Sequence, residues 1–321
     1  MYKCSINIRL TTLRDEMNFI NLQVMSTLFS YQPDKSDFRA LARCISLVEN
    51  AAEGYETFLR QLPSSSLQNI IGITGPPGAG KSTLTDALIG ELTASGNSVA
   101  VLCIDPSSPF HLGALLGDRI RMSSWYSHPN VYIRSLASRG SMGGLHPRII
   151  EVTEVLKAAG FDWIIIETVG VGQSEIEIAG LADITTVVLV PESGDEIQTM
   201  KAGLMEIADV FVVNKSDRPG ADAFVSNLRL MLAPAFSEKE REIPIVKTNA
   251  ASKEGVGALK DILIHMEHQV NKDRKAALMA EKAYQLIRNK RMEDLDKNDL
   301  KDSILRETGA FNLFQFIQKW V

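Results

Sequence analysis

Short apolar runs alternate with amphipathic stretches from residue 67 to about residue 247 of this 321-residue chain. Several runs are apolar on consecutive positions, which is typical of strands buried on both faces of a parallel sheet. The expected strands are Ile70–Thr74, Val99–Ile104, Val131–Arg134, Trp163–Glu167, Thr186–Val190, Val210–Val213 and Pro244–Lys247. The helices expected between them span residues 81–95, 145–159, 197–207, 221–232 and 256–269. This alternation predicts an α/β fold with a doubly wound, mostly parallel sheet.

Two helical patterns flank this core. Residues 36–61 carry Leu41 and Ile45 at helical spacing, and Ser36 or Asp37 is the candidate cap of the predicted helix. Beyond about residue 270 the pattern is again helical and is rich in charge. We therefore expect three parts, which are a helical N-terminal extension over residues 1–66, a core domain over residues 67–269 and a helical C-terminal extension over residues 270–321.

Composition narrows the class of protein. Hydrophobic residues make up 45% and charged residues 23%, as in ordinary globular proteins, and the net charge of −5 favours neither nucleic acid nor an anionic membrane. No run of about 18 apolar residues is present, so no membrane-spanning helix is expected. The three widely spaced cysteines fit a reducing compartment and form no Cys-x-x-Cys metal motif. We expect a cytoplasmic protein with no nucleic-acid or membrane partner.

A glycine-rich segment joins the first expected strand to the first expected helix. Its residues are Gly75-Pro76-Pro77-Gly78-Ala79-Gly80-Lys81-Ser82-Thr83, which satisfy the pattern Gly-x-x-x-x-Gly-Lys-Ser/Thr. Glycines let the backbone point several N–H groups inward, and the following helix N-terminus adds partial positive charge. Lys81 would neutralise the β- and γ-phosphates of a nucleotide, and the Ser82 hydroxyl would bind Mg²⁺. The strand–loop–helix context makes an ordinary tight turn the weaker interpretation.

The apolar run Val210–Val213 ends in Asn214-Lys215-Ser216-Asp217. The Asp217 carboxylate could accept hydrogen bonds from N1–H and the exocyclic amine of guanine, whereas adenine offers no such pair of donors. Alone, this motif could also be a helix cap or a loop, but together with the phosphate loop it predicts GTP and GDP as ligands. Backbone N–H groups of the segment Asn249-Ala250-Ala251 could reach the guanine O6, although an ordinary exit from a strand fits that spacing nearly as well.

Two acidic residues follow expected strands at the edge where α/β proteins bind ligands. Asp105 comes directly after one strand, and Glu167 ends another. Glu167 begins Glu-Thr-Val-Gly, in which the Gly170 N–H could sense a γ-phosphate and the carboxylate could contact Mg²⁺ directly or through water. For Asp105, a helix cap or an Asx-turn before Pro106 is the alternative.

Charged residues in two loops are further candidates. Arg119 and Arg121 follow Asp118, and an arginine beside a transferring phosphoryl group stabilises the transition state. A solvated ion pair is the alternative, and the sequence alone slightly favours it. The stretch Glu192–Gln198 ahead of Lys201 is either a nucleotide-sensing loop or the start of a helix. Spacing alone does not decide between these alternatives.

These motifs together resemble the MeaB/ArgK family of P-loop GTPases. The strings that carry the resemblance are GPPGAGKST (75–83), DPSSPF (105–110), GDRIRM (117–122), ETVGVGQSE (167–175), GDEIQTMKAG (194–203) and NKSDRPGAD (214–222). They occur in family order, and a looser similarity extends from about residue 40 to about residue 290.

The resemblance implies a P-loop fold of the SIMIBI class and a homodimer joined partly through C-terminal helices. It also implies GTP hydrolysis in the service of an adenosylcobalamin-dependent acyl-CoA mutase, usually methylmalonyl-CoA mutase, whose cofactor loading the GTPase gates and which it protects or reactivates. The site residues that it implies are Asp105, Asp118 and Glu167 for Mg²⁺ and the switches, Arg121 and Lys201 for hydrolysis or switching, and Asp195 in a further switch loop.

The chain departs from the family pattern in three places. After DPSSPF, His111-Leu112-Gly113-Ala114 replaces a Thr-Gly-Gly-Ser-like run, which could change switch mobility or Mg²⁺ coordination. Asn249-Ala250 stands where Ser-Ala is usual, a mild change because the backbone makes the expected contact. The divergent C-terminal helices leave the dimer geometry and the partner open.

Three other functions stay open from the sequence. They are a kinase of an arginine/ornithine transport system, a metal-insertion GTPase and a nucleotide-dependent scaffold in which hydrolysis hardly matters. The dispersed histidines and the lack of Cys-x-x-Cys count against metal insertion. Asn-Lys-x-Asp and the lack of a recognisable acceptor-binding lid count against the kinase.

Overall fold

The structure is a computed structural model of the full chain. It describes residues 32–64, 69–105, 122–139, 144–170, 174–193, 202–238, 242–267, 272–307 and 311–320. The chain divides into two compact units, the first ending at Asn271 and the second running from Lys272 to Val321.

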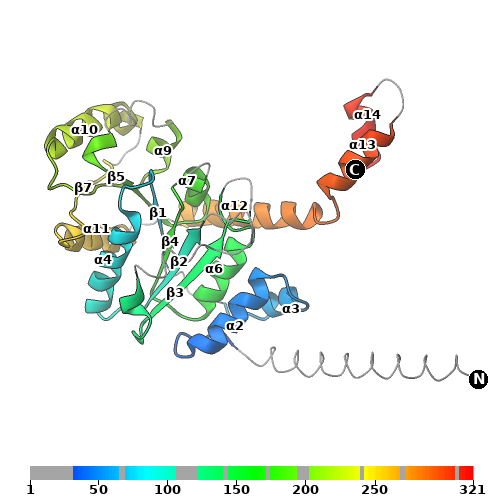
Figure 1. Cartoon of the computed structure of the whole chain (residues 1–321), viewed down its shortest axis with the longest axis horizontal. Helices are drawn as coiled ribbons and strands as arrows, with labels where there is room; N and C mark the ends of the chain where they lie inside the picture. Colours follow the sequence, from blue (N-terminus) through cyan, green and yellow to red (C-terminus); the bar gives the residue numbers. More distant parts are fainter. Residues whose placement is uncertain are drawn as a thin grey trace, which may run out of the picture. The chain divides into compact units, whose positions relative to one another are not determined.

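The first unit is built on a sheet in which all seven described strands are parallel (Figure 1). The strands are β1 (Asn69–Thr74), β2 (Val99–Asp105), β3 (Val131–Ala137), β4 (Trp163–Glu167), β5 (Ile184–Leu189), β6 (Val210–Val213) and β7 (Ile245–Lys247). Their order is β3-β2-β4-β1-β5-β6-β7, so β1 is the central strand, with β2, β3 and β4 on one side and β5, β6 and β7 on the other. This order confirms the predicted doubly wound parallel α/β fold.

Helices of the first unit cover both faces of this sheet. They are α2 (Phe38–Glu49), α3 (Tyr55–Arg60), α4 (Lys81–Ala94), α6 (Ile149–Ala158), α7 (Ser174–Glu177), α9 (Ala202–Ile207), α10 (Ala221–Glu238) and α11 (Val256–Glu267). Val210 and Val212 of β6 pack with α4 and α11, while Phe211 and Val213 pack with α9 and α10 on the opposite face. Successive side chains of a strand point to opposite faces, so an uninterrupted apolar run buries both faces.

The helix expected over residues 36–61 is wrong, because the structure has two helices there. Ala51 takes a left-handed φ of 47°, and N–H groups after α2 turn back to carbonyls of its last turn. Gly54, with φ 85°, then opens α3. Of the two candidate caps, Asp37 is the one used, since its side chain accepts hydrogen bonds from two N–H groups of the first turn of α2.

Several element boundaries also differ from the expected ones. Strand β3 continues to Ala137, three residues beyond its expected end. Helix α6 begins at Ile149 instead of residue 145, because Pro147 disfavours a helical conformation in the residue before it. Helix α10 continues to Glu238. Of the helix expected over residues 197–207, the part before Ala202 lies outside the described residues.

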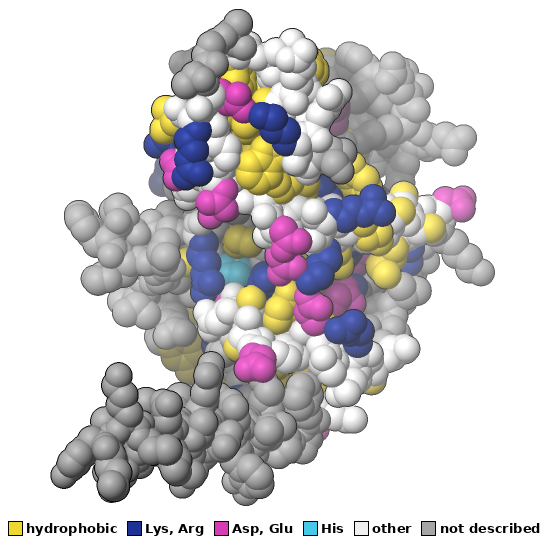
Figure 2. All heavy atoms as spheres, turned by 90° about the vertical axis from the view of Figure 1, so that its right-hand side faces the viewer, with side chains coloured by type: hydrophobic (Ala, Val, Ile, Leu, Met, Phe, Trp, Pro, Cys, Tyr) yellow, Lys and Arg dark blue, Asp and Glu magenta, His cyan; other side chains and the backbone are white. Residues whose placement is uncertain are grey.

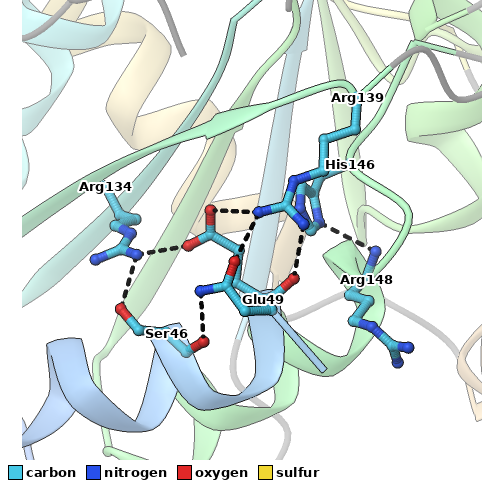
Figure 3. A network of polar contacts seen from close by, with 7 residues as sticks. Ser46, Glu49, Arg134, Arg139, His146 and Arg148 are labelled. Atoms are coloured by element: carbon cyan, nitrogen blue, oxygen red, sulfur yellow. Dashed lines mark hydrogen bonds and ion pairs between the residues drawn. The ribbon is translucent and has the colours of Figure 1, made fainter. Parts of the chain in front are cut away.

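A group of polar side chains, called here the arginine cluster, joins α2 to the carboxyl end of β3 (Figure 3). It consists of Glu49, Arg134, Arg139, His146 and Arg148. The Glu49 carboxylate lies 2.5 Å from Nη2 of Arg134 and 3.6 Å from Nη2 of Arg139. His146 is buried, and its Nδ1 accepts a hydrogen bond from the Arg148 N–H at 3.1 Å. The cluster thus connects the N-terminal helices to the sheet.

The imidazole of His146 is held in its neutral form. Burial lowers the pKa of His146 to about 4, and the positive charge of Arg139 acts in the same direction. Arg139 itself has a left-handed backbone with φ 50°, which costs a residue with a side chain about 1–2 kcal/mol. Its guanidinium contacts Glu49 and donates to the Asn50 Oδ1 at 2.9 Å, contacts that offset this backbone strain.

The second unit is helical in its described part. Its helices are α12 (Lys272–Arg291), α13 (Lys297–Arg306) and α14 (Leu313–Ile317). The Asp296 side chain caps α13, and the rings of Phe311 and Trp320 lie 5.6 and 6.2 Å from that of Phe316. Several large apolar side chains of this unit are exposed, among them Leu305 and Phe314.

The surface carries charges of both signs. On the face shown in Figure 2, Lys and Arg side chains lie interspersed with Asp and Glu side chains, and those drawn there form no large patch of one sign. Among the described helices, none combines the length and the apolar character that crossing a membrane requires.

Candidate functional site

The phosphate loop has the strand–loop–helix context that its sequence predicts. Strand β1 ends at Thr74, and α4 begins at Lys81. Gly75, Gly78 and Gly80 have φ values of 138°, 77° and 88°, conformations that residues with side chains rarely adopt. A Cβ on Gly75 would also lie 2.1 Å from the backbone oxygen of Val188 in β5. The loop therefore needs glycine both for its shape and for its close approach to the neighbouring strand.

Lys81 lies over this loop and is buried, with a 6% exposed surface. Its ammonium donates hydrogen bonds to the carbonyl oxygens of Gly75 at 2.8 Å and of Pro76 at 3.1 Å. Gly170, at φ 85°, sits against the same ammonium, and a Cβ there would lie 2.3 Å from Lys81 Nζ. The structure thus brings together the candidate phosphate-binding lysine and the candidate sensor of the γ-phosphate.

Next to the phosphate loop, three buried side chains of α4 and β4 form what we call the hydroxyl cluster: Ser82, Thr85 and Glu167. The Ser82 hydroxyl donates to Glu167 Oε1 at 2.6 Å, and the Thr85 hydroxyl lies 2.9 Å from Glu167 Oε2. Ser82 and Thr85 are three residues apart on α4 and therefore share one face of that helix. Glu167 ends β4, the neighbour of β1 in the sheet.

Asp105 lies at the same edge of the sheet. Asp105 is the last residue of β2. In the neighbouring strand β4, Glu167 pairs with Cys103, so Asp105 lies two residues beyond the position opposite Glu167. The side chain is buried, and the carbonyl oxygen accepts a hydrogen bond from the Ser138 N–H at 3.0 Å. The structure therefore places both candidate carboxylates at the carboxyl ends of adjacent strands.

The oxygens at this edge are of the kind that Mg²⁺ prefers. Mg²⁺ is usually held by one or two carboxylates together with phosphate oxygens and water, and a hydroxyl and two carboxylates meet that requirement. Within the described ranges, no group of three or more His, Cys, Asp or Glu side chains is arranged to hold a metal by itself. The hydroxyl and the two carboxylates fit an ion that is bound together with nucleotide phosphates.

Asn214 ties three loops of the site together. Its Nδ2 donates to the Ala79 oxygen in the phosphate loop at 2.9 Å, while its Oδ1 accepts from the Thr248 hydroxyl and from the Ala250 N–H, both at 3.1 Å. A Cβ on Gly80 would lie 2.5 Å from Asn214 Nδ2. The buried amide therefore holds the Asn-Lys-x-Asp segment and the loop after β7 against the phosphate loop.

The neighbouring residues of this motif differ in exposure. Lys215, with φ 54°, donates from Nζ to the Gly78 oxygen at 2.7 Å. Asp217 is exposed, as is Thr83 at the other end of the site. Arg218 pairs with Glu192, a residue that follows β5. An exposed carboxylate beside a tightly held loop is accessible to a ligand.

The loop after β7 limits which backbone N–H groups could bind a guanine O6. Of the three N–H groups expected to reach a guanine O6, that of Asn249 donates to the Glu254 oxygen at 3.0 Å, and that of Ala250 donates to Asn214. The Ala251 N–H has no hydrogen-bond partner in the described part of the chain. Ala251 is therefore the residue of this segment whose N–H is available for a base.

Four candidate residues lie outside the described residues. Asp118 and Arg121 belong to residues 106–121, which also contain Arg119 and the departure at residues 111–114, while Asp195 and Lys201 belong to residues 194–201. Their expected roles in metal binding, hydrolysis and switching stay predictions.

Sequence reasoning missed two of the contacts that organise the site. Thr85 carries a hydroxyl one helical turn after Ser82, and that i, i+3 spacing is the signal that could have revealed it. Thr248 is bound to Asn214 across 34 residues of chain, and no local pattern marks such a contact.

A glycine-rich phosphate loop between β1 and α4, with a hydroxyl–carboxylate cluster behind it and an Asn-Lys-x-Asp segment beside it, defines the class of P-loop nucleotide hydrolases. Comparison with known proteins identifies the family. A family model described as methylmalonyl Co-A mutase-associated GTPase MeaB matches residues 41–303. The chain belongs to this family and is a GTPase, as the sequence motifs predict.

Known relatives carry related names. A Pyrococcus abyssi protein named "Putative GTPase" is 51% identical over 232 residues, which are 71% of each chain. The GTPase ArgK of Escherichia coli is 33% identical over 280 residues, 84% of this chain and 82% of that protein. The mitochondrial methylmalonic aciduria type A homolog of Mus musculus is 34% identical over 262 residues, 74% of this chain and 61% of that protein.

The fold is also found in a solved structure. The crystal structure of an LAO/AO transport system kinase matches with a TM-score of 0.62 at 24% sequence identity, over 92% of this chain and 96% of that one. At that identity the match confirms the fold.

Proposed function

We propose that this GTPase is a chaperone of an adenosylcobalamin-dependent acyl-CoA mutase, with methylmalonyl-CoA mutase as the first candidate partner. GTP binding and hydrolysis would gate cofactor loading and would protect or reactivate the mutase. Two findings support the partner. The matching family is described as mutase-associated, and the mouse relative is named for methylmalonic aciduria.

The observation that carries a signalling role is the contact between Gly170 and Lys81. A phosphate that draws the Lys81 ammonium toward itself necessarily changes the surroundings of Gly170, whose Cα lies against that ammonium. Gly170 stands four residues before α7, and Ile176 of α7 packs on Gly203 of α9, where a Cβ would lie 2.9 Å from the isoleucine Cδ1. We expect a change at the phosphate loop to reach α7 along the chain that follows Gly170, and α9 through the packing of Ile176 on Gly203.

The remaining site residues have proposed roles in nucleotide binding. Lys81 would bind the β- and γ-phosphates, and Ser82 would bind Mg²⁺ with help from Asp105 and Glu167. The exposed Asp217 would select guanine. The roles proposed for residues outside the described ranges are Mg²⁺ coordination for Asp118, charge stabilisation during hydrolysis for Arg121 and switching for Asp195 and Lys201.

A homodimer is part of this proposal. The described helices of the second unit expose Tyr284, Ile287, Leu305, Leu313 and Phe314, and exposed apolar side chains in such number are typical of a protein–protein contact. Light scattering of the purified protein checks the assembly, and a monomer mass at micromolar concentration would contradict it.

The test of the chaperone function is binding to purified methylmalonyl-CoA mutase in the presence of GTP, GDP, ATP or no nucleotide. We expect the affinity for the mutase to differ at least about fivefold between the GTP- and GDP-bound forms, which is the lower range of measured allosteric coupling. Lys81→Ala is the matched control, because it removes the phosphate contact and should abolish the difference.

Three outcomes would count against the proposal. Equal mutase binding in all nucleotide states would contradict the chaperone function. Equal affinity for ATP and GTP would contradict the guanine selectivity assigned to Asp217. Transfer of labelled γ-phosphate to an acceptor other than water would instead support the transport-kinase alternative.

A further inference from the structure

Thr85 is the least accessible member of the hydroxyl cluster, with no exposed surface. Its hydroxyl lies 2.9 Å from Glu167 Oε2, and the Ser82 hydroxyl lies 2.6 Å from Glu167 Oε1. Each carboxylate oxygen of Glu167 thus faces one hydroxyl from the same helix. Two contacts on the two oxygens determine the rotation of the carboxylate plane, which a single contact would leave open.

A purely structural explanation of Thr85 has to be weighed first. Threonine hydroxyls in helices commonly bond to the carbonyl oxygen four residues earlier, and the Thr85 hydroxyl lies 3.0 Å from the Lys81 oxygen. Thr153 in α6 makes that bond to Ile149 at 2.6 Å and is equally buried, but no carboxylate contact accompanies it. A hydroxyl has one proton, and a hydrogen bond to a carboxylate is about twice as strong as one to a neutral carbonyl. The Thr85 proton therefore belongs chiefly to Glu167.

We propose that Thr85 is a positioning residue that orients Glu167 toward Ser82 and so prepares Ser82 for Mg²⁺. This inference rests on the proposed role of Ser82 in Mg²⁺ binding. With Oε2 held by Thr85, Oε1 stays directed at the Ser82 hydroxyl and accepts its hydrogen bond. The lone pairs of the Ser82 oxygen then face away from the carboxylate, toward the phosphate loop and an ion bound there with the nucleotide.

The test compares Thr85→Val with Thr153→Val. Both changes remove a buried hydroxyl and keep its volume, but only the first removes a contact with Glu167. The probe is a fluorescent GDP analogue, and its affinity is measured with excess Mg²⁺ and again in EDTA. We expect Thr85→Val to reduce the Mg²⁺-dependent gain in affinity by about tenfold, which is the lower range for a lost hydrogen bond to a charged group. Affinity in EDTA should change less than about twofold.

Rescue separates positioning from packing. Thr85→Ser keeps the hydroxyl and loses only a methyl group, so its Mg²⁺-dependent gain should stay within about threefold of the original. Thr153→Val should keep the full gain, although it also loses a buried hydrogen bond and should lower the thermal stability. If Thr85→Val does not fold, Thr85→Ala carries the same expectation, because it introduces no bulk.

Two results would overturn the inference, and they are distinguishable. A full Mg²⁺-dependent gain in Thr85→Val or Thr85→Ala would show that Thr85 only bonds to its own helix. An unmodified protein with no Mg²⁺-dependent gain would instead contradict the proposed metal role of Ser82, and the positioning role of Thr85 would fall with it.

Discussion

Two groups of polar side chains near the carboxyl edge of one sheet, the buried hydroxyl cluster and the partly buried arginine cluster, are built in opposite ways. The hydroxyl cluster places two short side chains of α4 against the Glu167 carboxylate at the end of β4, at hydrogen-bond distances of 2.6 and 2.9 Å. The arginine cluster uses long side chains that bridge α2 and the end of β3, and its two contacts to the Glu49 carboxylate measure 2.5 and 3.6 Å. Short side chains lose little conformational entropy when they are ordered, whereas each arginine loses up to about 2 kcal/mol.

This difference matches two different roles: the hydroxyl cluster is suited to ligand binding, and the arginine cluster attaches a helix to the sheet. A cluster of short side chains beside a glycine loop leaves the loop free to contact phosphates, and it holds oxygens in the geometry that Mg²⁺ requires. A cluster of arginines around one carboxylate spans the wider gap between two elements that are distant in sequence. We therefore expect changes in the arginine cluster to alter stability and changes beside the phosphate loop to alter nucleotide binding.

The largest expected effect is on stability, from Glu49→Gln. This change removes a mostly buried negative charge and leaves Arg134 and Arg139 facing each other without it. We expect the free energy of unfolding to fall by about 3 kcal/mol, while GTP affinity changes less than about threefold. Urea unfolding and nucleotide titration measure the two quantities. Glu56→Gln, in an exposed pair with Arg60, is the control and should change stability by less than about 0.5 kcal/mol. If Glu49→Gln lowered the free energy of GTP binding by more than it lowered the free energy of unfolding, the two clusters would not differ in function.

The reverse pattern is expected from Lys81→Ala. The Lys81 ammonium donates hydrogen bonds to the Gly75 and Pro76 oxygens of the phosphate loop, and it is more buried than Lys215, which donates to the Gly78 oxygen. We expect GTP affinity to fall about 100-fold, equivalent to about 2.7 kcal/mol, while stability changes by less than about 1 kcal/mol. The exposed Lys290, paired with Glu293, offers a control in Lys290→Ala. If Lys81→Ala lowered GTP affinity by less than about threefold, Lys81 and its loop would not be the phosphate-binding site.

The smallest expected effect is the pH dependence caused by His146. Its pKa is about 4 in the folded protein, chiefly because of burial, against about 6.5 in an unfolded chain. The unfolded state therefore binds more protons between these values, and stability falls as the pH drops through that window. Between pH 7 and pH 5 this amounts to about 2 kcal/mol.

His146→Asn isolates that contribution. The asparagine keeps an acceptor for the Arg148 N–H but does not titrate, so the variant should lose about 2 kcal/mol less than the original protein between pH 7 and pH 5. Urea unfolding of both proteins at the two pH values measures the difference. Identical pH dependence would mean that His146 does not cause the loss of stability between pH 7 and pH 5.

The fold was largely predictable because its signals are local. Consecutive apolar residues predicted every strand of the sheet, and Trp163–Glu167 and Val210–Val213 have the predicted bounds. The single helix predicted over residues 36–61 failed at Ala51, whose left-handed backbone is stabilised by a turn back onto α2. Helical periodicity continues through such a break, so the pattern alone conceals it.

The candidate site was predictable to a similar degree. The candidate residues lie at the carboxyl edge of the sheet, as their positions in the sequence require: Glu167 ends β4, and Lys81, Ser82, Asn214 and Asp217 follow strands. The partners of these residues were not predictable, since Thr248 reaches Asn214 and Thr85 reaches Glu167 through contacts between separate elements. Such contacts depend on strand order, which the sequence pattern does not state.

The sequence by itself determined the parallel α/β core, the phosphate loop and the guanine motif, because each depends on residue types at fixed spacing within one segment. Only the tertiary structure decided that Asn214 ties loops together, that Gly170 meets Lys81 and that two hydroxyls hold Glu167. These contacts join residues that are far apart in the sequence, 34 positions for Thr248 and Asn214. They therefore form only after the strands have taken their order in the sheet.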